Sequence, residues 1–260
     1  MEKKYYVIGN WKMNPGNLNE AKSTAKTLQR ITPNSKYVET VICPPSVFLY
    51  TLQKEIKGKT KYGHQGIHYE AKGAFTTKIS ASMAASAGAK FGIIGHSEER
   101  REGVTDEMVS GSLKNCLKEG MTPVLCVGEN ERDQNGFYFN IIRQQIETAL
   151  SNIPKTRYTD IIIAYEPVWA IGKDAKRPAS ANEFLEIKIY IQKVITDLSN
   201  RKTADEVSII YGGSADDTNI LPFLEAGAMG FLPGRASLEP EVFSKMVLEV
   251  IDFAKNEGSK

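Results

Sequence analysis

Short apolar runs alternate with longer stretches of helical periodicity along the whole chain. The short runs are rich in β-branched residues, which favours strands, and the longer stretches repeat apolar residues every three or four positions, which favours amphipathic helices. The short runs predict strands at 5–9, 38–43, 60–65, 91–95, 122–127, 160–165, 206–211 and 228–233. The stretches between them predict helices at 17–30, 46–55, 80–88, 106–119, 137–150, 181–199, 216–226 and 240–255. Lys61, His64 and Gln65 interrupt the third apolar run, so that strand is the least regular.

Several of the expected helices carry local start or stop signals. Thr105 precedes one helix, and Ser180 with Glu183 has the spacing of a capping box. Gly120 and Gly227 follow two other helices, where a residue free to adopt positive φ ends a helix well. These signals agree with the helix boundaries that periodicity predicts.

Strict alternation of strand and helix predicts parallel strands joined by right-handed crossovers. Eight such units close most naturally into a (β/α)8 barrel of the α/β class. No shift in composition and no linker divides the chain, so residues 1–260 are expected to form a single domain. The alternative is an open doubly wound sheet, which is less favoured because no G-x-G-x-x-G follows the first strand.

Composition and charge exclude several classes of protein. The chain has 260 residues, 41% hydrophobic and 25% charged, which is unlike a collagen, a disordered tail or a cysteine-stapled mini-protein. Its formal net charge is only +2, without a long basic block, so no binding to nucleic acid or to a membrane is expected. No segment approaches 18 consecutive apolar residues. Any anion that the protein binds is therefore expected to be small and held locally.

The cysteines and the N-terminus indicate a cytoplasmic protein. Cys43, Cys116 and Cys126 are far apart and odd in number, which favours reduced thiols over a disulfide framework or a metal site. The N-terminal sequence MEKKYYVIGNWK has only a short apolar run, so it lacks the core of a secretory signal. No metal and no targeting segment are expected.

Candidate chemistry follows the first and fourth strands, because the active sites of barrels lie at the carboxyl ends of the strands. Asn10 and Lys12 come directly after the first strand, although most lysines in such a position are solvated loop residues. His96 follows the fourth strand as a candidate acid, base or electrophile, or as a histidine with a purely structural hydrogen bond. A helix starting at Ser97 would disfavour a positive imidazole and keep His96 neutral.

A carboxylate and a long connection follow the sixth strand. Glu166 precedes the apolar residues Val168, Trp169 and Ile171, which could desolvate it and raise its pKa toward that of a working base. The connection runs on to Pro178, as a hinged lid would. The alternative, a surface acid before an ordinary loop, leaves an exposed Trp and Ile unexplained.

Glycine clusters follow the last two strands. Gly212, Gly213 and Ser214 come after the seventh strand, and Gly234 and Arg235 after the eighth. Such residues let backbone N–H groups approach an anion, and barrels commonly bind phosphate at this place. Glycine pairs are common in turns, but two clusters after the two final strands favour a phosphate site.

These residues and their neighbours resemble one family, triosephosphate isomerase. The resemblance rests on GNWKMN (9–14), GAFT (73–76) with IS (79–80), IGHSE (94–98), CVGE (126–129), AYEPVWAIG (164–172), YGGS (211–214) and GFLPG (230–234) with ASL (236–238). These stretches occur in the family's order along the whole chain. The resemblance implies a TIM barrel that isomerises a small sugar phosphate without a cofactor.

The resemblance also implies roles for individual residues. Glu166 would be the base that moves a proton between adjacent carbons through an enediol(ate), and neutral His96 would polarise the carbonyl. Lys12 and Asn10 would stabilise the negative charge, with Glu98 as a supporting acid near Lys12. Phosphate would be held by backbone N–H groups of residues in the loops after the sixth, seventh and eighth strands, namely Gly172, Ser214, Gly234 and Arg235. The lid would span about residues 167–177.

Departures from the family pattern leave the choice of substrate open. Gly172 is followed by KDAKRPAS instead of a T-G-K-type run, Arg235 replaces a usual Gly, and Pro233 replaces an aliphatic residue. The lid and Arg235 look similar to paralogues that isomerise four-carbon erythrulose phosphates. The leading hypothesis is interconversion of dihydroxyacetone phosphate and D-glyceraldehyde 3-phosphate, as in glycolysis and gluconeogenesis. The alternatives are the four-carbon isomerase and a non-catalytic phosphate-binding barrel, which would need neither Glu166 nor His96.

A paired departure bears on assembly. Lys78 and Glu99 stand where family members usually carry an acid and an Arg that meet across a dimer interface. Both signs are reversed, so the attraction is retained. The resemblance therefore implies a homodimer in which Lys78 of one protomer faces Glu99 of the other, with two unrelated surface substitutions as the alternative.

Overall fold

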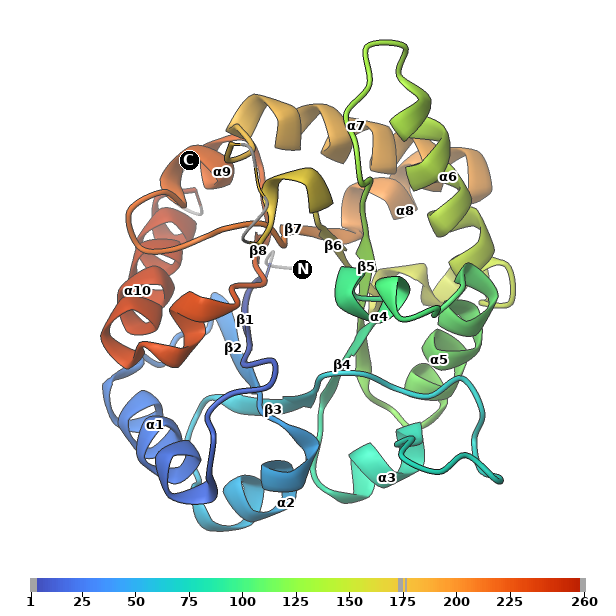
Figure 1. Ribbon diagram of the computed structural model, residues 1–260. Helices are drawn as coiled ribbons and strands as arrows, with labels where there is room; N and C mark the ends of the chain where they lie inside the picture. The colour runs from blue at the N-terminus through green and yellow to red at the C-terminus, as the bar shows by residue number, and fades with distance from the viewer. Residues whose placement is uncertain (1–3, 173–174, 176, 258–260) are drawn as a thin grey trace.

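Eight parallel strands close into a barrel in the order in which they occur along the chain (Figure 1). The computed structural model describes residues 4–172, 175 and 177–257. The strands are β1 Tyr5–Asn10, β2 Val38–Cys43, β3 Lys61–His64, β4 Phe91–Ile94, β5 Thr122–Val127, β6 Ile162–Tyr165, β7 Ser208–Tyr211 and β8 Gly230–Phe231. The predicted fold class, a (β/α)8 TIM barrel, is confirmed.

Helices surround the strands, as Figure 1 shows. The α-helices are α1 Leu18–Ile31, α2 Ser46–Glu55, α3 Ala81–Ser86, α4 Ser97–Arg101, α5 Asp106–Lys118, α6 Phe137–Leu150, α7 Ala181–Leu198, α8 Arg201–Glu206, α9 Leu221–Glu225 and α10 Pro240–Glu257. Short 3-10 helices are η1 Lys155–Asp160, η2 Val168–Ala170 and η3 Arg235–Leu238. Among these described helices, none is both long and apolar enough to span a membrane.

The strands are apolar on both faces because both faces are buried. Side chains such as Ile8, Ile93 and Ile162 fill the barrel interior, whereas Val7, Ile94 and Ile163 pack outward against the helices. This two-sided burial produces the nearly continuous apolar runs that predicted the strands.

Closure of the barrel depends on a glycine. Strand β8 pairs with β1 through Tyr6 and Gly230 and through Val7 and Phe231. Gly230 has φ 137°, and a Cβ atom there would overlap the carbonyl oxygen of Tyr6. Only glycine fits this close approach. Strand β8 is only two residues long, against the six that the apolar pattern predicts for 228–233.

The expected helix at 216–226 is wrong over its first half, where the chain forms turns before α9. Asp216 Oδ1 accepts from the backbone N–H of Thr218 at 2.9 Å, which offers the backbone an alternative to a helix. Pro222 then lies in the first turn of α9, where its missing N–H costs nothing.

Two further helices differ from the predicted elements. The separate helix α8 begins after Asn200, whose side chain accepts from the Thr203 N–H at 2.9 Å. It ends at Glu206, the residue at which the seventh strand was predicted to start. Helix α4 begins at Ser97, in a connection where apolar periodicity predicts no helix. The expected caps are confirmed: Thr105 accepts from Met108 N–H, and Ser180 with Glu183 forms a capping box.

Candidate active site

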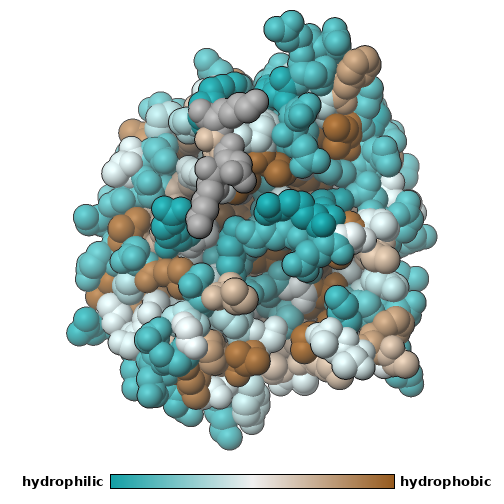
Figure 2. Space-filling view, in the orientation of Figure 1, coloured by the Kyte–Doolittle hydropathy of each residue, from teal (hydrophilic) through white to brown (hydrophobic). Residues whose placement is uncertain are grey.

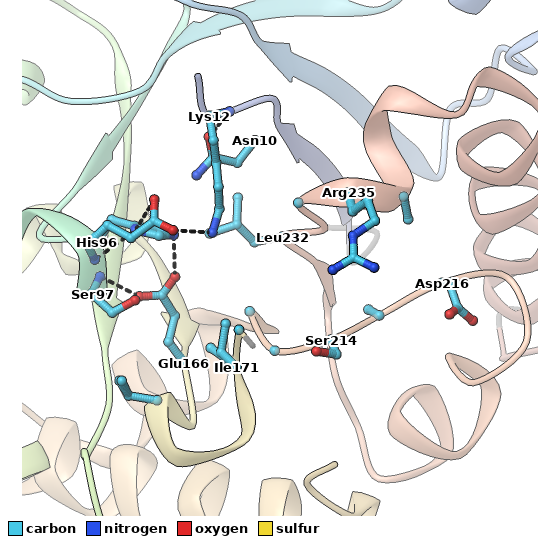
Figure 3. A pocket seen from close by; sticks show the side chains of 18 of the residues that line it. Asn10, Lys12, His96, Ser97, Glu166, Ile171, Ser214, Asp216, Leu232 and Arg235 are labelled. Atoms are coloured by element: carbon cyan, nitrogen blue, oxygen red, sulfur yellow. Dashed lines mark hydrogen bonds and ion pairs between the residues drawn. The ribbon is translucent and has the colours of Figure 1, made fainter. Parts of the chain in front are cut away.

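A cleft of about 1240 Å³ opens at the carboxyl ends of the strands (Figure 3). Its described lining includes all eight residues expected from the sequence, which come from five different strand ends: Asn10, Lys12, His96, Glu166, Gly172, Ser214, Gly234 and Arg235. The fold thus brings together residues that are up to 225 positions apart in sequence.

Glu166 and His96 form the buried pair of this cleft. Glu166 directly follows β6, and its backbone N–H donates to the carbonyl of Val127 on the neighbouring β5 at 2.8 Å. Its side chain is almost inaccessible, and His96 is also buried. Nε2 of His96 lies 3.0 Å from Oε1 of Glu166, and the Ser97 N–H donates to Oε2 at 2.9 Å. Both carboxylate oxygens therefore have a partner, and the role of the Ser97 N–H is not visible in the sequence.

The hydrogen bonds of His96 define its tautomer. The Glu98 N–H donates to Nδ1 at 3.1 Å, so Nδ1 carries no proton and Nε2 holds the proton that faces Glu166. Burial lowers the pKa of His96, but the Glu166 carboxylate opposes burial and the net shift is upward. This upward shift depends on contact with Glu166. Without that contact, burial and the nearby Lys12 ammonium both favour the neutral ring.

Lys12 is held on an unusual backbone. Its φ is 51°, in the left-handed region that non-glycine residues rarely occupy. Its N–H donates to Oδ1 of Asn10 at 3.0 Å, and its carbonyl accepts from Nε2 of Gln65 at 2.7 Å. Its Nζ lies 2.7 Å from Oε1 of Glu98. The ammonium group is thus positioned by both backbone and side-chain contacts.

Gln65 was missed as a site residue. Its Nε2 donates to the carbonyl of Cys43 at 2.9 Å as well as to that of Lys12. The Gln65 side chain, which follows β3, therefore joins the end of β2 to the segment that follows β1. In the sequence Gln65 only interrupts an apolar run, and a contact between residues 53 positions apart leaves no local signal.

Glycines allow the backbone to pack closely around Glu166. A Cβ atom at Gly128 would overlap the carbonyl oxygen of Glu166. A Cβ atom at Gly212 would come within 3.0 Å of Cγ of Glu166. Gln145 fixes Gly128 further, since its amide accepts from the Gly128 N–H at 2.8 Å and donates to its carbonyl at 3.0 Å. Glycines at these two positions thus allow the neighbouring backbone to pack against the main chain and the side-chain stem of Glu166.

The connection after β6 begins with a buried carboxylate contact. Nε1 of Trp169 donates to Oε1 of Glu129 at 2.7 Å, and the Tyr165 hydroxyl donates to the same oxygen at 2.8 Å. Glu129 is fully buried, and burial raises its pKa. Trp169 was expected to be exposed, but it is partly buried and has a polar partner. In the sequence Glu129 is only the last residue of the CVGE stretch, and its contacts with Trp169 and Tyr165 leave no local signal.

Arg177 contacts the same tryptophan from the far end of the expected lid. Its guanidinium lies 4.5 Å from the ring centroid of Trp169 and pairs with Glu183 at 2.6 Å. The hydrogen bond from Arg177 lowers the pKa of Glu183 to about 2. Of the lid expected over 167–177, residues 173, 174 and 176 lie outside the described residues.

The other end of the cleft is open and rich in glycine. Ser214, after β7, is exposed, and Gly234 precedes η3, which begins at Arg235. Figure 3 shows Arg235 and Ser214 across the pocket from His96 and Glu166, with Lys12 and Asn10 between the two groups. The hydroxyl and N–H of Ser237 both donate to the Gly234 carbonyl, at 2.6 and 3.0 Å, and stabilise this turn.

The described residues include no cluster of three or more His, Cys, Asp or Glu side chains that could hold a metal ion. The three cysteines are free and buried. Burial raises the pKa of all three thiols, for Cys116 to about 12. The ionisable groups at the cleft are therefore the carboxylates, His96 and the basic side chains.

Comparison with known proteins agrees with the fold. The family model described as triosephosphate isomerase matches residues 5–250. The triosephosphate isomerase of Aquifex aeolicus (strain VF5) is 38% identical over 246 residues, which cover 93% of this chain and 97% of the relative. The enzyme of the same name from Endomicrobium trichonymphae is 37% identical, covering 94% and 98%. That of Natranaerobius thermophilus is 35% identical, covering 97% and 98%. With matches over nearly its whole length, the chain belongs to the triosephosphate isomerase family.

Proposed function

We propose that this isomerase interconverts dihydroxyacetone phosphate and D-glyceraldehyde 3-phosphate through an enediol(ate). The observation that carries the proposal is the buried Glu166 carboxylate, 3.0 Å from Nε2 of His96 in the cleft. A base beside a polarising N–H is the arrangement that proton transfer next to a carbonyl requires. The family match and the names of the three relatives support the same reaction.

Glu166 serves as the base in this proposal. Its carboxylate removes a proton from C1 of dihydroxyacetone phosphate and returns it to C2, so no atom is gained or lost. To reach the substrate it gives up its contacts with the Ser97 N–H and with His96. The lost contact with Glu166 also removes the influence that raises the pKa of His96.

His96, Lys12 and Asn10 stabilise the charge that develops on oxygen. His96 donates from Nε2 to the carbonyl oxygen and relays protons between the two oxygens. The Lys12 ammonium adds a positive charge, and Glu98 at 2.7 Å orients it. Oδ1 of Asn10 is engaged by the Lys12 N–H, which leaves the Asn10 amide N–H₂ to donate into the cleft.

Backbone N–H groups hold the phosphate at the open end of the cleft. The donors are those of Gly172, Ser214, Gly234 and Arg235, which line the same cleft as Glu166. Glycines at 212, 213 and 234 let the anion approach the backbone. No cofactor takes part in this reaction.

The test is a comparison of kcat/KM for D-glyceraldehyde 3-phosphate and for four-carbon erythrulose phosphates. We expect the triose phosphate to be preferred. A ratio that favours the tetrose would replace the proposed substrate and leave the reaction type intact. Binding of phosphate without turnover of either substrate would instead support the non-catalytic barrel.

We further propose a homodimer in which Lys78 of one protomer faces Glu99 of the other. Large apolar side chains are exposed on α2 and α3, where Val47 is 80% and Met83 58% accessible. Figure 2 shows several separate apolar side chains, among polar ones, near the lower edge of the molecule. Burial raises the pKa of Glu99 to about 7 in the single chain, although Lys78 of the same chain opposes this shift. The Lys78 ammonium group of the second protomer would oppose it further and keep this carboxyl ionised.

Charge reversal at Lys78 tests this interface. We expect Lys78→Glu to weaken the dimer at least tenfold in sedimentation experiments, because two acids would then face each other. The control is Lys202→Glu, an exposed reversal on α8. A dimer that is unaffected by Lys78→Glu contradicts the pairing.

Residues 1–260 form a single cytoplasmic domain in this proposal. The free, buried state of Cys43, Cys116 and Cys126 suits a reducing compartment. Elements from Tyr5 to Glu257 belong to one closed barrel and its surrounding helices, which supports a single domain.

A further inference from the structure

The cleft presents more acidic than basic side chains to an incoming phosphate ester. Its described lining contains seven carboxylates, from Glu98, Glu131, Asp133, Glu166, Asp216, Asp217 and Glu239. The basic side chains of that lining are five, from Lys12, Arg101, Arg132, Arg177 and Arg235. The described side chains of the lining thus carry no excess of positive charge, so a cation that stands free of carboxylates would favour the entry of a dianion.

Four of these five cations lie within 4.0 Å of a carboxylate. Glu98 pairs with Lys12 at 2.7 Å and lies 4.0 Å from Arg101. Glu183 pairs with Arg177 at 2.6 Å and lies 3.9 Å from Arg132. Arg132 also pairs with Glu186. These charges are largely engaged before any ligand binds.

Arg235 differs from the other four. Within residues 4–172, 175 and 177–257, its guanidinium has neither an ion pair nor a hydrogen bond. Figure 3 shows the guanidinium directed into the cleft, on the side of the loop that carries Ser214. It therefore faces the region where the phosphate is expected, and no described side chain competes for it.

The backbone that carries Arg235 is well anchored. The neighbouring Ser237 is fully buried, and its carbonyl accepts from Nε1 of Trp11 at 3.1 Å. A Cβ atom at Gly234 would lie 3.5 Å from Cε of Lys12, so this turn also packs against the Lys12 side chain. The guanidinium is thus presented from a fixed base next to the phosphate loops.

We propose that the Arg235 side chain binds the phosphate of the substrate directly, in addition to the backbone N–H groups. This inference rests on the proposed function, because it concerns the phosphate end of the same site. A guanidinium offers two parallel N–H groups to two phosphate oxygens, a geometry that an ammonium lacks. Arg235 supplies the free positive charge that the acidic lining otherwise withholds, so it sets substrate affinity and its salt dependence.

The test uses Arg235→Gln and Arg235→Lys in the full chain. The dissociation constant for inorganic phosphate is measured by calorimetry. KM and kcat with triose phosphate are measured by steady-state kinetics. Both sets of measurements are made at low and at high ionic strength. For Arg235→Gln we expect phosphate affinity to fall and KM to rise about tenfold at low salt, while kcat changes less than threefold. The difference from wild type should shrink as salt screens the charge. Arg235→Lys should recover part of the affinity.

Arg101→Gln is the matched control, because it removes a guanidinium from the same cleft lining at a position already near Glu98. We expect its phosphate affinity and KM to stay within twofold of wild type. Equal phosphate affinity in wild type and Arg235→Gln at low salt overturns the proposal, as does an equal loss in both variants. The phosphate measurement needs no turnover. If wild type is inactive but binds phosphate more tightly than Arg235→Gln does, the result contradicts the proposed reaction and leaves the role of Arg235 intact.

Discussion

The two ends of the cleft are built in opposite ways. At the end with Glu166 and His96, both side chains are buried and both oxygens of Glu166 have hydrogen-bond partners. At the end with Ser214 and Arg235, both residues are exposed, and the Arg235 guanidinium has no partner among the described residues. Proton transfer needs fixed geometry and a dry environment, whereas a charged group that must enter and leave needs access. The buried, hydrogen-bonded end thus suits proton transfer, and the exposed, charged end suits binding and release of the phosphate.

The comparison predicts that Glu166→Gln separates catalysis from binding. Removal of a general base costs about 10²–10⁴-fold in rate, so kcat should fall by that amount. Affinity for inorganic phosphate should stay within twofold, because the phosphate end is unchanged. Steady-state kinetics and calorimetry on the same preparation give both numbers. Intact turnover would exclude Glu166 as the base, and a large loss of phosphate affinity would show that the two ends are not independent.

Lys12→Met tests the residue that lies between the ends. Loss of one group that stabilises an oxyanion typically costs about 10²–10³-fold in kcat, and we expect a loss of that size. Unlike Glu166→Gln, this variant should also bind phosphate several-fold more weakly, because loss of the ammonium leaves the Glu98 carboxylate in the cleft without its partner at 2.7 Å. If only phosphate affinity changes, Lys12 belongs to the phosphate end alone. A circular dichroism spectrum identical to that of wild type controls for folding, since Met inherits the left-handed backbone of Lys12.

The smallest effect is expected at Arg177, where an ion pair at the surface joins the end of the expected lid to α7. The pKa of Glu183 is lowered to about 2 from the usual 4.5, chiefly by the hydrogen bond from Arg177. A lowered carboxyl pKa stabilises the fold above the unfolded value, and this contribution disappears as the pH falls through the folded value. Arg177→Gln should therefore reduce the free energy of unfolding by about 0.2–1 kcal/mol at pH 7.

The difference in free energy of unfolding between wild type and Arg177→Gln should shrink between about pH 4.5 and pH 2, because Glu183 then becomes protonated in both proteins. Urea unfolding of wild type and Arg177→Gln at several pH values measures it. Arg201→Gln, which breaks a more exposed pair with Asp205, is the control and should have a smaller effect. A difference that grows toward low pH would contradict the assigned role of Arg177.

The barrel could be predicted because its strands are buried on two faces and its helices on one. Both kinds of burial leave a periodic pattern, so the eight strands and most helices were found from apolar spacing. The turns at 216–220 and the short helix α8 depend on the side-chain caps of Asp216 and Asn200, which override that spacing. Local polar chemistry thus accounts for the main errors in the predicted elements.

The predicted site residues share one cleft because each lies at or after the end of a strand, a position that the fold class defines. The residues that support them were harder to find. Gln65 and Glu129 act through contacts with residues 53 and 40 positions away, respectively, and these contacts exist only after the barrel has closed. Sequence patterns located the groups that are proposed to face the substrate, and the structure adds those that hold them in place.

The bridging amide of Gln65 also makes the first three loops a single unit for protein engineering. Because it ties the carbonyls of Lys12 and Cys43 together, a new loop after β1 inherits constraints from the ends of β2 and β3. A library that randomises residues 11–14 alone will discard variants whose backbone no longer meets this amide. A library design should therefore exchange three segments together between related barrels, namely residues 11–14, 43–45 and 65.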